Sequence, residues 1–455
     1  MPRKKYTVVS LFTGAMGLDI GLERTGRFKT IACVEKVHSF CETIRLNRDK
    51  GRLGDRRMKV FEADISTFDP ADMLAELRLE PGDVDLVAGG PPCQSFSTAG
   101  RRGTVCDPRG TLIWQFLRFV VAMQPKFFLM ENVRGLLSAA LRHRPIKERP
   151  DKGGPPLQPD EEPGSVVRLY TEDFSKSGPA PYRIDCFEVN AVNYGSPQLR
   201  ERVLFIGNRF NRLVHFPSPT HGHAEEPPEG ERQQLLFDPA EDDGPIPFGT
   251  LGDAIQGLHE EAPVIMDFSP RKKRYLSMVP PGGNWRSLPE DVQRESMGGA
   301  WHAKGGRSGW WRRLSYDLPC PTVLTMPNHA SSSLCHPEEV RALTVRECAL
   351  VQEFPPDWEF VGSAQEQYAQ VGNAVPVRLG QVAGEVIARE LDDLRKGGCQ
   401  VEGGDHPVFR LEYIRSHVRT RRWYKAGRAY VWRDGKENSK AEYGKSVTQR
   451  KERQL

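Results

Sequence analysis

The sequence predicts an α/β protein built on a doubly wound, mainly parallel sheet. Short apolar runs of strand length alternate with segments whose apolar residues recur three and four apart, and this alternation is typical of βαβ units. The first run leads directly into a glycine-rich turn, as in parallel sheets that bind nucleotides. The runs are residues 7–11, 30–34, 84–88 and 127–130.

Helical segments separate these strands in order along the chain. After the turn at residues 12–17, Leu18 and Leu22 lie four apart on one helical face. The second strand closes on Glu35 and precedes a helical stretch near 37–46. Between the third and fourth runs, one helix face collects Leu112, Ile113, Phe116, Leu117, Val120 and Val121.

Composition excludes several protein classes. The chain has 455 residues, 38% hydrophobic and 27% charged, which suits a soluble protein of two or three domains at roughly 100–200 residues each. The nine cysteines include no C-x-x-C pair, so neither a disulfide framework nor a zinc site is indicated, and a reducing compartment fits best. The N-terminus lacks a signal-peptide cleavage pattern, and the apolar stretch 111–123 is too short to cross a bilayer. We therefore expect a cytoplasmic protein.

Charge is distributed unevenly along the chain. The net charge is +4, but residues 401–455 hold 14 Lys and Arg against 7 Asp and Glu, so residues 1–400 carry −3. Such a tail could hold nucleic acid through phosphate contacts, or it could be a solvated basic terminus without a partner.

The regular pattern is interrupted twice. Residues 145–165 and 217–247 are rich in Pro, Gly and acidic residues, so we predict loops or poorly ordered insertions there. Residues 250–340 contain scattered Gly, Trp and Arg without a clean period. An amphipathic helix returns at 377–391, with Pro376 near its first turn.

The first turn and the end of the second strand suit a nucleotide-like ligand. Gly14 and Gly17 let the backbone approach a ligand closely, and Glu35 could bind ribose hydroxyls. The turn lacks the G-x-G-x-x-G spacing of dinucleotide-binding oxidoreductases. Asp64, after an apolar turn at Val60 and Phe61, is a candidate for an adenine amino group or a plain surface aspartate.

Cys93 is the candidate nucleophile. It lies in a Gly- and Pro-rich loop, residues 89–97, directly after the strand at 84–88, where ligands bind in open α/β sheets. Cysteine readily becomes a soft nucleophile near neutral pH, although a lone Cys is more often a small buried hydrophobe.

Two further strand ends supply charged groups. One carries Glu131 and Asn132, and the other carries Arg200, Glu201 and Arg202 into the apolar run 203–206. If these strands are neighbours, a thiol, a carboxyl and guanidinium groups converge on one crevice. The same residues could instead form structural ion pairs.

Residues 7–395 resemble the DNA (cytosine-5)-methyltransferase family of the prokaryotic restriction-modification type, and the matching motifs occur in the family's order. One departure is Met16, where family members commonly have Gly, which narrows the conformational freedom of the turn. The matching motifs are Phe12 to Gly17, Glu35, Asp64 with Ile65, Pro91 to Gln94, Glu131 to Val133, Gln198 to Arg202, Arg312 to Ser315 through Pro321 and Thr322, and Gln370 to Pro376.

The resemblance implies a Rossmann-like, S-adenosylmethionine-dependent fold and a mechanism without a metal. Cys93 would add to C6 of cytosine, Glu131 would protonate N3, and Arg202 would hold O2, so that C5 takes the methyl group of S-adenosylmethionine. The implied cofactor-binding residues are Phe12, Gly14, Gly17, Leu18, Glu35, Asp64, Ile65, Pro92, Asn373 and Val375. The implied substrate-binding residues are Gln94, Ser97, Asn132 and Arg200, the last of which also supports its loop.

The resemblance also implies a domain division and a partner. Residues 1–207, completed by 341–396, would form the catalytic domain, and the smaller, loop-rich 208–340 would recognise the target in double-stranded DNA. The target base must be flipped out of the duplex, because the chemistry cannot occur inside a stacked helix. Residues 397–455 would be a basic tail. Candidate groove contacts are Trp285, Trp301, Trp310, Trp311, Arg286, Arg307, Arg312 and Arg313, about half of which we expect to be core or solvated surface.

Three other functions were weighed against a DNA cytosine-5 methyltransferase. A transfer-RNA cytosine-5 methyltransferase would share Cys93 and Glu131, but the Cys-Phe-Thr signature of those relatives is missing here. A catalytically silent DNA-binding scaffold is disfavoured by the intact Cys93, Glu131 and Arg202. A zinc deaminase would need P-C-x-x-C after His223-Ala224-Glu225, which does not follow. We expect a nucleoid-associated monomer, with a restriction endonuclease for the same site as a possible partner.

Overall fold

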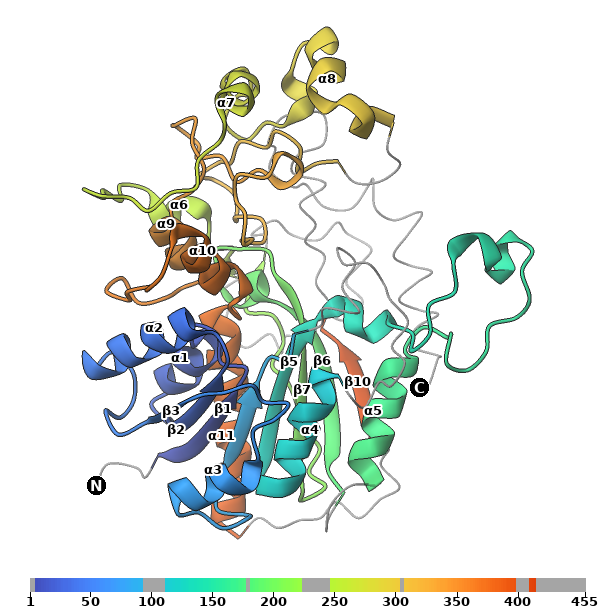
Figure 1. Cartoon of the computed structure of the whole chain (residues 1–455), viewed down its shortest axis with the longest axis vertical. Helices are drawn as coiled ribbons and strands as arrows, with labels where there is room; N and C mark the ends of the chain where they lie inside the picture. The colour runs from blue at the N-terminus through green and yellow to red at the C-terminus, as the bar shows by residue number, and fades with distance from the viewer. Residues whose placement is uncertain are drawn as a thin grey trace.

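An eight-stranded sheet forms the centre of the computed structural model, which describes residues 5–92, 111–176, 181–222, 246–302, 307–397 and 409–414. The strand order is β10-β6-β7-β5-β4-β1-β2-β3, and β7 alone runs antiparallel to its neighbours. This confirms the predicted mainly parallel, doubly wound sheet (Figure 1). The strands are β1 (Tyr6–Leu11), β2 (Phe28–Glu35), β3 (Lys59–Glu62), β4 (Leu86–Gly89), β5 (Phe127–Val133), β6 (Arg183–Asn190), β7 (Glu201–Asn208) and β10 (Phe409–Tyr413).

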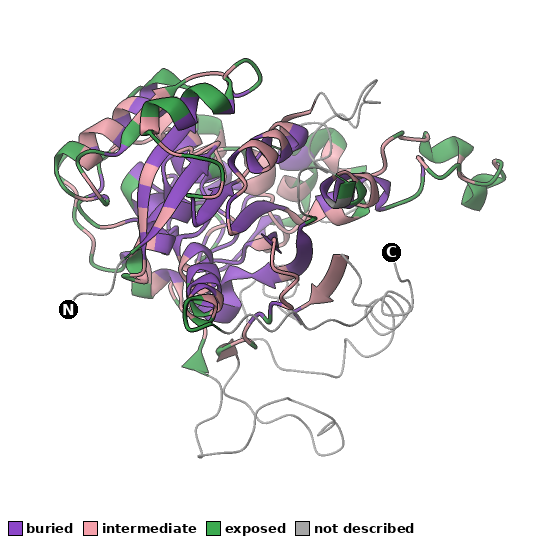
Figure 2. Cartoon of the chain, turned by 90° about the horizontal axis from the view of Figure 1, so that it is seen from below, coloured by how far each residue is buried: buried purple, intermediate pink, exposed green. Residues whose placement is uncertain are grey.

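Helices cover both faces of the sheet, because successive strand residues point to opposite faces. Val9 and Leu11 of β1 join one core with the apolar faces of α3 (Pro70–Leu77), α4 (Leu112–Met123) and α5 (Ser165–Lys176). Tyr6 and Val8 join the opposite core with α1 (Gly17–Arg24) and α11 (Val377–Arg395). Helix α2 (His38–Asp49) follows β2. Figure 2 shows the central strands of the sheet buried and the outer helix faces exposed.

A second, irregular region lies beyond the sheet, with its own core. It contains α6 (Leu251–Ile255), α7 (Pro270–Ser277), α8 (Glu290–Met297) and the small pair β8 (His221–Gly222) and β9 (Ile246–Pro247). Helices α9 (Val345–Val351) and α10 (Ala364–Asn373) lie between α7–α8 and the sheet (Figure 1). Short 3-10 helices span Arg134–Ser138, Ile146–Glu148, Pro150–Lys152, Ala191–Tyr194, Trp285–Ser287, Gly298–His302 and Ala330–Ser332.

The structure corrects two details of the sequence prediction and confirms the first predicted loop. Val60 and Phe61 belong to strand β3 rather than to an apolar turn. Residues 145–164 form a loop with two short 3-10 helices, as predicted, and residues 223–245 of the second insertion lie outside the described residues. Residues 409–413, expected in a basic tail beyond the catalytic domain, form an edge strand of the sheet.

Within the described ranges, no helix is both long and apolar enough to span a membrane.

Candidate active site

The candidate site lies at the carboxyl edge of the sheet, where β1, β4 and β5 end side by side. The loop that leaves β4 passes directly against the carboxylate at the end of β5. A side-chain carbon added at Gly90 would lie 3.0 Å from Glu131 Oε2. The last described residue of this loop is Pro92, which is exposed. Cys93, Gln94 and Ser97 lie outside the described residues.

The cysteines that the structure does describe are poor nucleophiles. All six are buried: Cys33, Cys41, Cys186, Cys320, Cys335 and Cys348. Burial raises the pKa of Cys41, Cys320 and Cys335 to about 12, and raises the pKa of the other three as well. Because the thiolate is the reactive form, these thiols are inert near neutral pH.

Glu131 and Arg202 form an ion pair across neighbouring strands. Strands β5 and β7 are antiparallel, with Val133 opposite Arg202, so Glu131 lies diagonally across from Arg202 on the same face of the sheet. Arg202 Nε lies 2.5 Å from Glu131 Oε1, and the side chains are 12% and 10% exposed. The structure thus brings together these two predicted catalytic residues.

Asn132 ties the end of β5 to the loop that leads to Cys93. Its side-chain amide Nδ2 donates to the Pro91 carbonyl at 3.0 Å, and its Oδ1 accepts from the Val133 N–H at 2.9 Å. Asn132 is 3% exposed. Its geometry is therefore that of a residue that positions the loop two residues before Cys93.

Arg200 departs from the expected contact with substrate. It is 2% exposed, and its guanidinium donates to the carbonyls of Val323 (2.9 Å) and Gly372 (2.8 Å). Burial and the nearby Arg202 lower its pKa, whereas Glu131 opposes that shift. Arg200 thus joins three distant segments of the chain and acts on the site through the backbone that it holds.

Gln352 is a buried residue of the site that the sequence analysis missed. It is fully buried, donates to the carbonyls of Val371 (2.7 Å) and Ala374 (3.2 Å), and accepts from Gln198 Nε2 at 2.6 Å. It thereby links the start of β7 to the segment around Val375. The available sequence signal was an amide directly after the apolar run 349–351.

The turn after β1 is closed by Glu35. Gly14 adopts φ +57°, a conformation that favours glycine, and its N–H donates to Glu35 Oε2 at 2.8 Å. Glu35 Oε1 accepts from the N–H groups of Lys36 (2.8 Å) and Val37 (2.9 Å). A carboxylate offers about four acceptor positions, so Glu35 can still accept from a ligand hydroxyl.

The C-terminal part of the chain completes this turn. A side-chain carbon at Gly17 would lie 2.4 Å from the Val375 carbonyl oxygen, so only glycine allows the two segments to meet. Leu18 and Val375 are buried in the same core, whereas Asn373, at the end of α10, is exposed.

The remaining predicted cofactor residues lie along the ends of the next strands. Asp64 follows β3 and accepts from Lys36 Nζ at 2.9 Å and from the Ser66 N–H at 2.9 Å, which lowers its pKa to about 2. Ile65 is buried, and Phe12 is half-buried against the same core. Asp64 thus lies on the same sheet edge as Glu35, with a half-exposed carboxylate.

Several predicted DNA contacts are structural. Trp285 and Trp311 are buried in the core of the second region. Arg312 Nε donates to the Ser333 carbonyl, and Arg313 donates to the carbonyls of Pro337, Val279 and Glu338. Two candidates stack on an indole instead: the guanidinium carbons of Arg286 and Arg307 lie 4.5 and 5.1 Å from the Trp285 ring centre.

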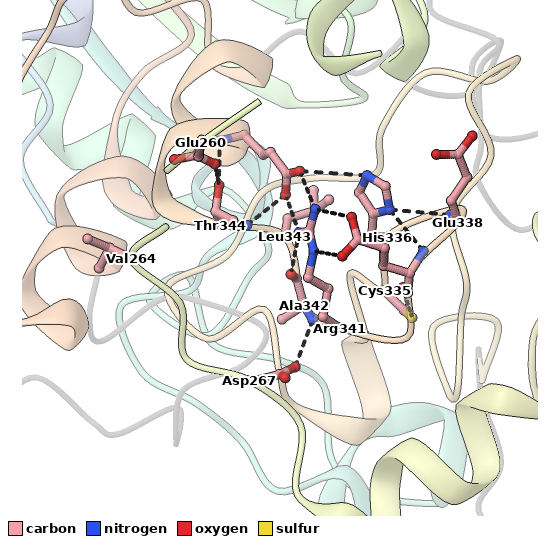
Figure 3. A network of polar contacts seen from close by, with 12 residues as sticks. Glu260, Val264, Asp267, Cys335, His336, Glu338, Arg341, Ala342, Leu343 and Thr344 are labelled. Atoms are coloured by element: carbon pink, nitrogen blue, oxygen red, sulfur yellow. Dashed lines mark hydrogen bonds and ion pairs between the residues drawn. The ribbon is translucent and has the colours of Figure 1, made fainter. Parts of the chain in front are cut away.

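A network of ion pairs and hydrogen bonds joins the second region to α9 (Figure 3). Arg341 donates from both terminal nitrogens to Glu347 at 2.8 Å each, and the Thr344 N–H donates to the same carboxylate at 2.8 Å. Thr344 Oγ donates to Glu260 at 2.6 Å, and His336 Nε2 lies 3.6 Å from Glu347. This network fixes the start of α9, the helix that ends beside Gln352.

Comparison with known proteins identifies the family. The sequence profile of the C-5 cytosine-specific DNA methylases matches residues 6–389. The chain is 33% identical to the Type II methyltransferase M.Sau96I of Staphylococcus aureus over 86% of this chain and 77% of that protein, and 36% identical to M.Eco47II of Escherichia coli over 86% and 81%.

The fold is also found among solved structures. A protein described as a DNA modification methyltransferase of an Escherichia coli prophage superposes with a TM-score of 0.52 at 21% identity, over 86% of this chain and all of that one. This likeness supports the methyltransferase fold. The family profile and the curated relatives together show that this chain belongs to the C-5 cytosine-specific DNA methylases and is a DNA cytosine-5 methyltransferase.

Proposed function

We propose that the enzyme methylates C5 of a cytosine that is flipped out of a specific double-stranded DNA sequence, through a covalent bond between Cys93 and C6. The observation that carries this proposal is the Glu131–Arg202 ion pair beside the loop that leads to Cys93. An ion pair formed before the base arrives holds both groups in one orientation, which is how enzymes stabilise charge that develops in a transition state.

Each residue has a defined task in this mechanism. The Cys93 thiolate forms a bond to C6, the electrons of the C5–C6 double bond shift to C4–C5, those of the C4–N3 bond shift to N3, and N3 takes a proton from the acid form of Glu131. Arg202 holds the cytosine O2. After C5 has taken the methyl group, the C5 proton is lost to solvent, the Cys93 thiolate leaves C6, and N3 returns its proton to Glu131, which restores the aromatic ring.

The turn after β1 suits the implied cofactor. S-adenosylmethionine, when bound, supplies the electrophilic methyl group. No atom lies within 4 Å of the position that a side chain at Gly14 would take, and Glu35 keeps an acceptor position for a ribose hydroxyl. Asp64 would accept from the adenine amino group, and Leu18, Ile65 and Val375 would supply apolar contact.

Single-base mapping tests the activity. The protein is expressed in a bacterial host that lacks DNA methylation, and 5-methylcytosine is mapped by bisulfite conversion. We expect near-complete methylation of one short motif, loss of it in Cys93→Ser, and retention of it in Cys399→Ser, which removes a thiol outside the family motifs. Methylation by Cys93→Ser, or transfer-RNA methylation without DNA methylation, would contradict the proposal.

Two further experiments test the finer steps. A duplex with 5-fluorocytosine at the mapped site has no C5 proton to lose, so the Cys93–C6 bond should persist as a complex that survives denaturing electrophoresis.

Because the relatives are named Type II methyltransferases, we also propose that this enzyme protects DNA within a restriction-modification system. Genomic DNA from the expressing host should then resist an endonuclease that cuts the mapped motif.

A further inference from the structure

Gln352 lies between two segments that belong to opposite halves of the candidate site. It follows the last residue of α9 and is fully buried. One segment is the start of β7, which carries Arg202 into the cytosine pocket, formed with Glu131. The other follows α10 and presents Val375 to the cofactor turn, residues 12–17 after β1. The Gln352 side-chain amide is hydrogen-bonded to both segments.

The segment that leads into β7 is held through Gln198. This residue is fully buried, and its Nε2 donates to Gln352 Oε1 at 2.6 Å and to the Val351 carbonyl at 3.1 Å. Its Oε1 accepts from the Val323 N–H at 3.4 Å. Gln198 lies four residues before Arg202. A displacement of Gln198 would therefore reach Arg202 along a short length of chain.

The segment that reaches the cofactor turn is held at the end of α10. The last carbonyls of a helix have no partner within the helix, so other groups must satisfy them. Gln352 Nε2 donates to the carbonyls of Val371 at 2.7 Å and Ala374 at 3.2 Å. The carbonyl oxygen of the next residue, Val375, lies directly against Gly17. Gln352 thus fixes the direction in which the chain leaves α10 toward the cofactor turn.

Arg200 supports the same end of α10 independently. Its guanidinium donates to the Gly372 carbonyl at 2.8 Å and to the Val323 carbonyl at 2.9 Å. A side-chain carbon at Gly372 would lie 2.5 Å from the Thr325 backbone nitrogen, so the two backbones are in close contact there. Loss of the Gln352 amide should therefore shift the segment after α10 without detaching it from the fold.

The hydrogen-bonding groups of Gln352 allow one arrangement. Both N–H groups of Nε2 have a carbonyl acceptor, and Oε1 accepts from Gln198. The backbone carbonyl of Gln352 also accepts from the Val377 N–H at 3.2 Å, which ties it to the start of α11. A buried amide whose partners are all in place cannot rotate without leaving polar groups unpaired. The two segments are therefore held at one separation.

We propose that Gln352 is a positioning residue for methyl transfer, which sets the separation between the cofactor turn and the cytosine pocket. This inference rests on the proposed function, in which Arg202 holds cytosine and the turn holds S-adenosylmethionine. Because Gln352 is fully buried, it acts through the segments that carry Arg202 and Val375. Reacting atoms must lie about 3–3.5 Å apart before they react, and a misplacement of about 1 Å lowers a rate by roughly 10²-fold.

The test uses two full-length variants at this position. Gln352→Glu keeps an acceptor for Gln198 but loses the N–H groups that bind the Val371 and Ala374 carbonyls. Gln352→Met has a similar length and loses all three hydrogen bonds without placing a carboxyl group in the core. If one variant fails to fold, the other carries both measurements.

Asn47 provides a matched control, because it is a fully buried amide with similar contacts in α2, outside the two segments. Its Nδ2 donates to the carbonyls of Thr43 (2.8 Å) and Glu359 (2.7 Å). Its Oδ1 accepts from the Glu359 N–H and from Arg52 Nη1, at 3.1 Å each. Asn47→Leu should lower stability by removing these bonds and leave both halves of the site in place.

The first measurement is the single-turnover methylation rate per folded molecule, at saturating duplex and S-adenosylmethionine and below the unfolding transition. We expect a fall of roughly 10²-fold in the Gln352 variants and the parental rate in Asn47→Leu. If Gln352 only supported the fold, its variants would lose stability and keep this rate. A parental rate in the Gln352 variants, or an equal loss in Asn47→Leu, would overturn the proposal.

The second measurement needs neither DNA nor turnover. Titration calorimetry gives the dissociation constant of S-adenosylhomocysteine for the free protein. We expect it to rise several-fold in the Gln352 variants, because the Val375 segment supports the cofactor turn, and to stay parental in Asn47→Leu. If the parent chain methylates no DNA, the proposed function fails, whereas this comparison still tests the inference. Equal affinities in all the proteins would then reject it.

Discussion

Glu131 at the sheet edge and Glu347 at the junction with the second region are both carboxylates paired with an arginine, yet their surroundings differ. Glu347 is 3% exposed and accepts from two Arg341 nitrogens and the Thr344 N–H. Glu131 meets Arg202 through one oxygen, and its other oxygen faces the loop at Gly90. A carboxylate with its acceptor positions filled fixes structure, whereas one with spare positions can bind a ligand.

Removing the acid at Glu131 should have the largest effect. We expect Glu131→Gln to lower the single-turnover methylation rate by roughly 10³-fold or more, because the group that protonates N3 is lost together with its ion pair. Glu201→Gln, which alters a neighbouring carboxylate that pairs with Arg134, is the control and should keep its rate. Equal rates for the two variants would show that the spare oxygen of Glu131 has no chemical role.

Asp19 extends the comparison to a buried carboxylate without a cation. It is 1% exposed and accepts from Ser10 Oγ at 2.8 Å, and burial raises its pKa to about 7. Since the folded pKa lies above the unfolded value, Asp19 contributes stability at low pH that is lost as pH rises from about 4 to 7.

The shift corresponds to a loss of up to about 4 kcal/mol across that pH range. Urea unfolding at pH 4.5 and pH 8 should therefore show a smaller drop in unfolding free energy for Asp19→Asn than for the parent. An identical drop in both proteins would mean that Asp19 is already charged in the folded protein across the whole range.

Breaking the ion pair between Glu347 and Arg341 should lower stability and leave the methylation rate unchanged. Glu347→Gln removes the charged acceptor of Arg341 and the Thr344 N–H, while Arg341 keeps its pair with Glu339, and we expect a loss of about 2 kcal/mol in unfolding free energy. Below its unfolding transition the variant should methylate DNA at the parental rate per folded molecule. A large loss of rate in fully folded protein would show that the junction also controls the active site.

The exposed pair of Lys36 and Asp64 should give the smallest effect. Their side chains are 71% and 38% exposed, and such pairs stabilise proteins little. Lys36→Gln should leave the thermal midpoint unchanged, while the pKa of Asp64 rises from about 2, because Lys36 is the main cause of its low value. A carboxyl-carbon NMR titration measures this shift, and an unshifted Asp64 would reject that cause.

The sequence predicted individual strands and helices better than it predicted which strands lie side by side. The strands at 7–11 and 127–130 and the helix at 377–391 follow from apolar periodicity, and the structure confirms them. The pairing of Glu131 with Arg202 depends on β7 running antiparallel beside β5, which no local pattern encodes.

Other features were missed for identifiable reasons. Strand β10 is only five residues long, and its alternation of Phe409, Leu411 and Tyr413 with charged residues is short enough to pass for part of a basic tail. Arg313 was one of the candidate groove contacts because arginines among glycines suit such contacts, but its guanidinium donates to three backbone carbonyls. The sequence does not show which backbone carbonyls lack an N–H partner, because that depends on how the loops fold, so it could not show that Arg313 binds three of them.

At Met16, packing in the core outweighs the local preference for glycine at a positive φ. It adopts φ +70°, where glycine is favoured, yet its side chain is fully buried. Relief of backbone strain by Met16→Gly is worth about 1 kcal/mol, whereas deleting a buried methionine costs about 2–5 kcal/mol. The departure from the family's usual glycine is therefore explained by the core that Met16 fills.

The contact between Gly17 and Val375 has a consequence for how the protein is made. The two residues are 358 positions apart in a chain of 455 residues, so the first turn cannot be completed until the C-terminal helices have emerged from the ribosome. Contacts between such distant residues slow folding and leave early strands uncovered during synthesis. The enzyme should therefore become active only after its C-terminal helices have been synthesised, and the nascent N-terminal strands are the part of the chain that most needs protection by chaperones.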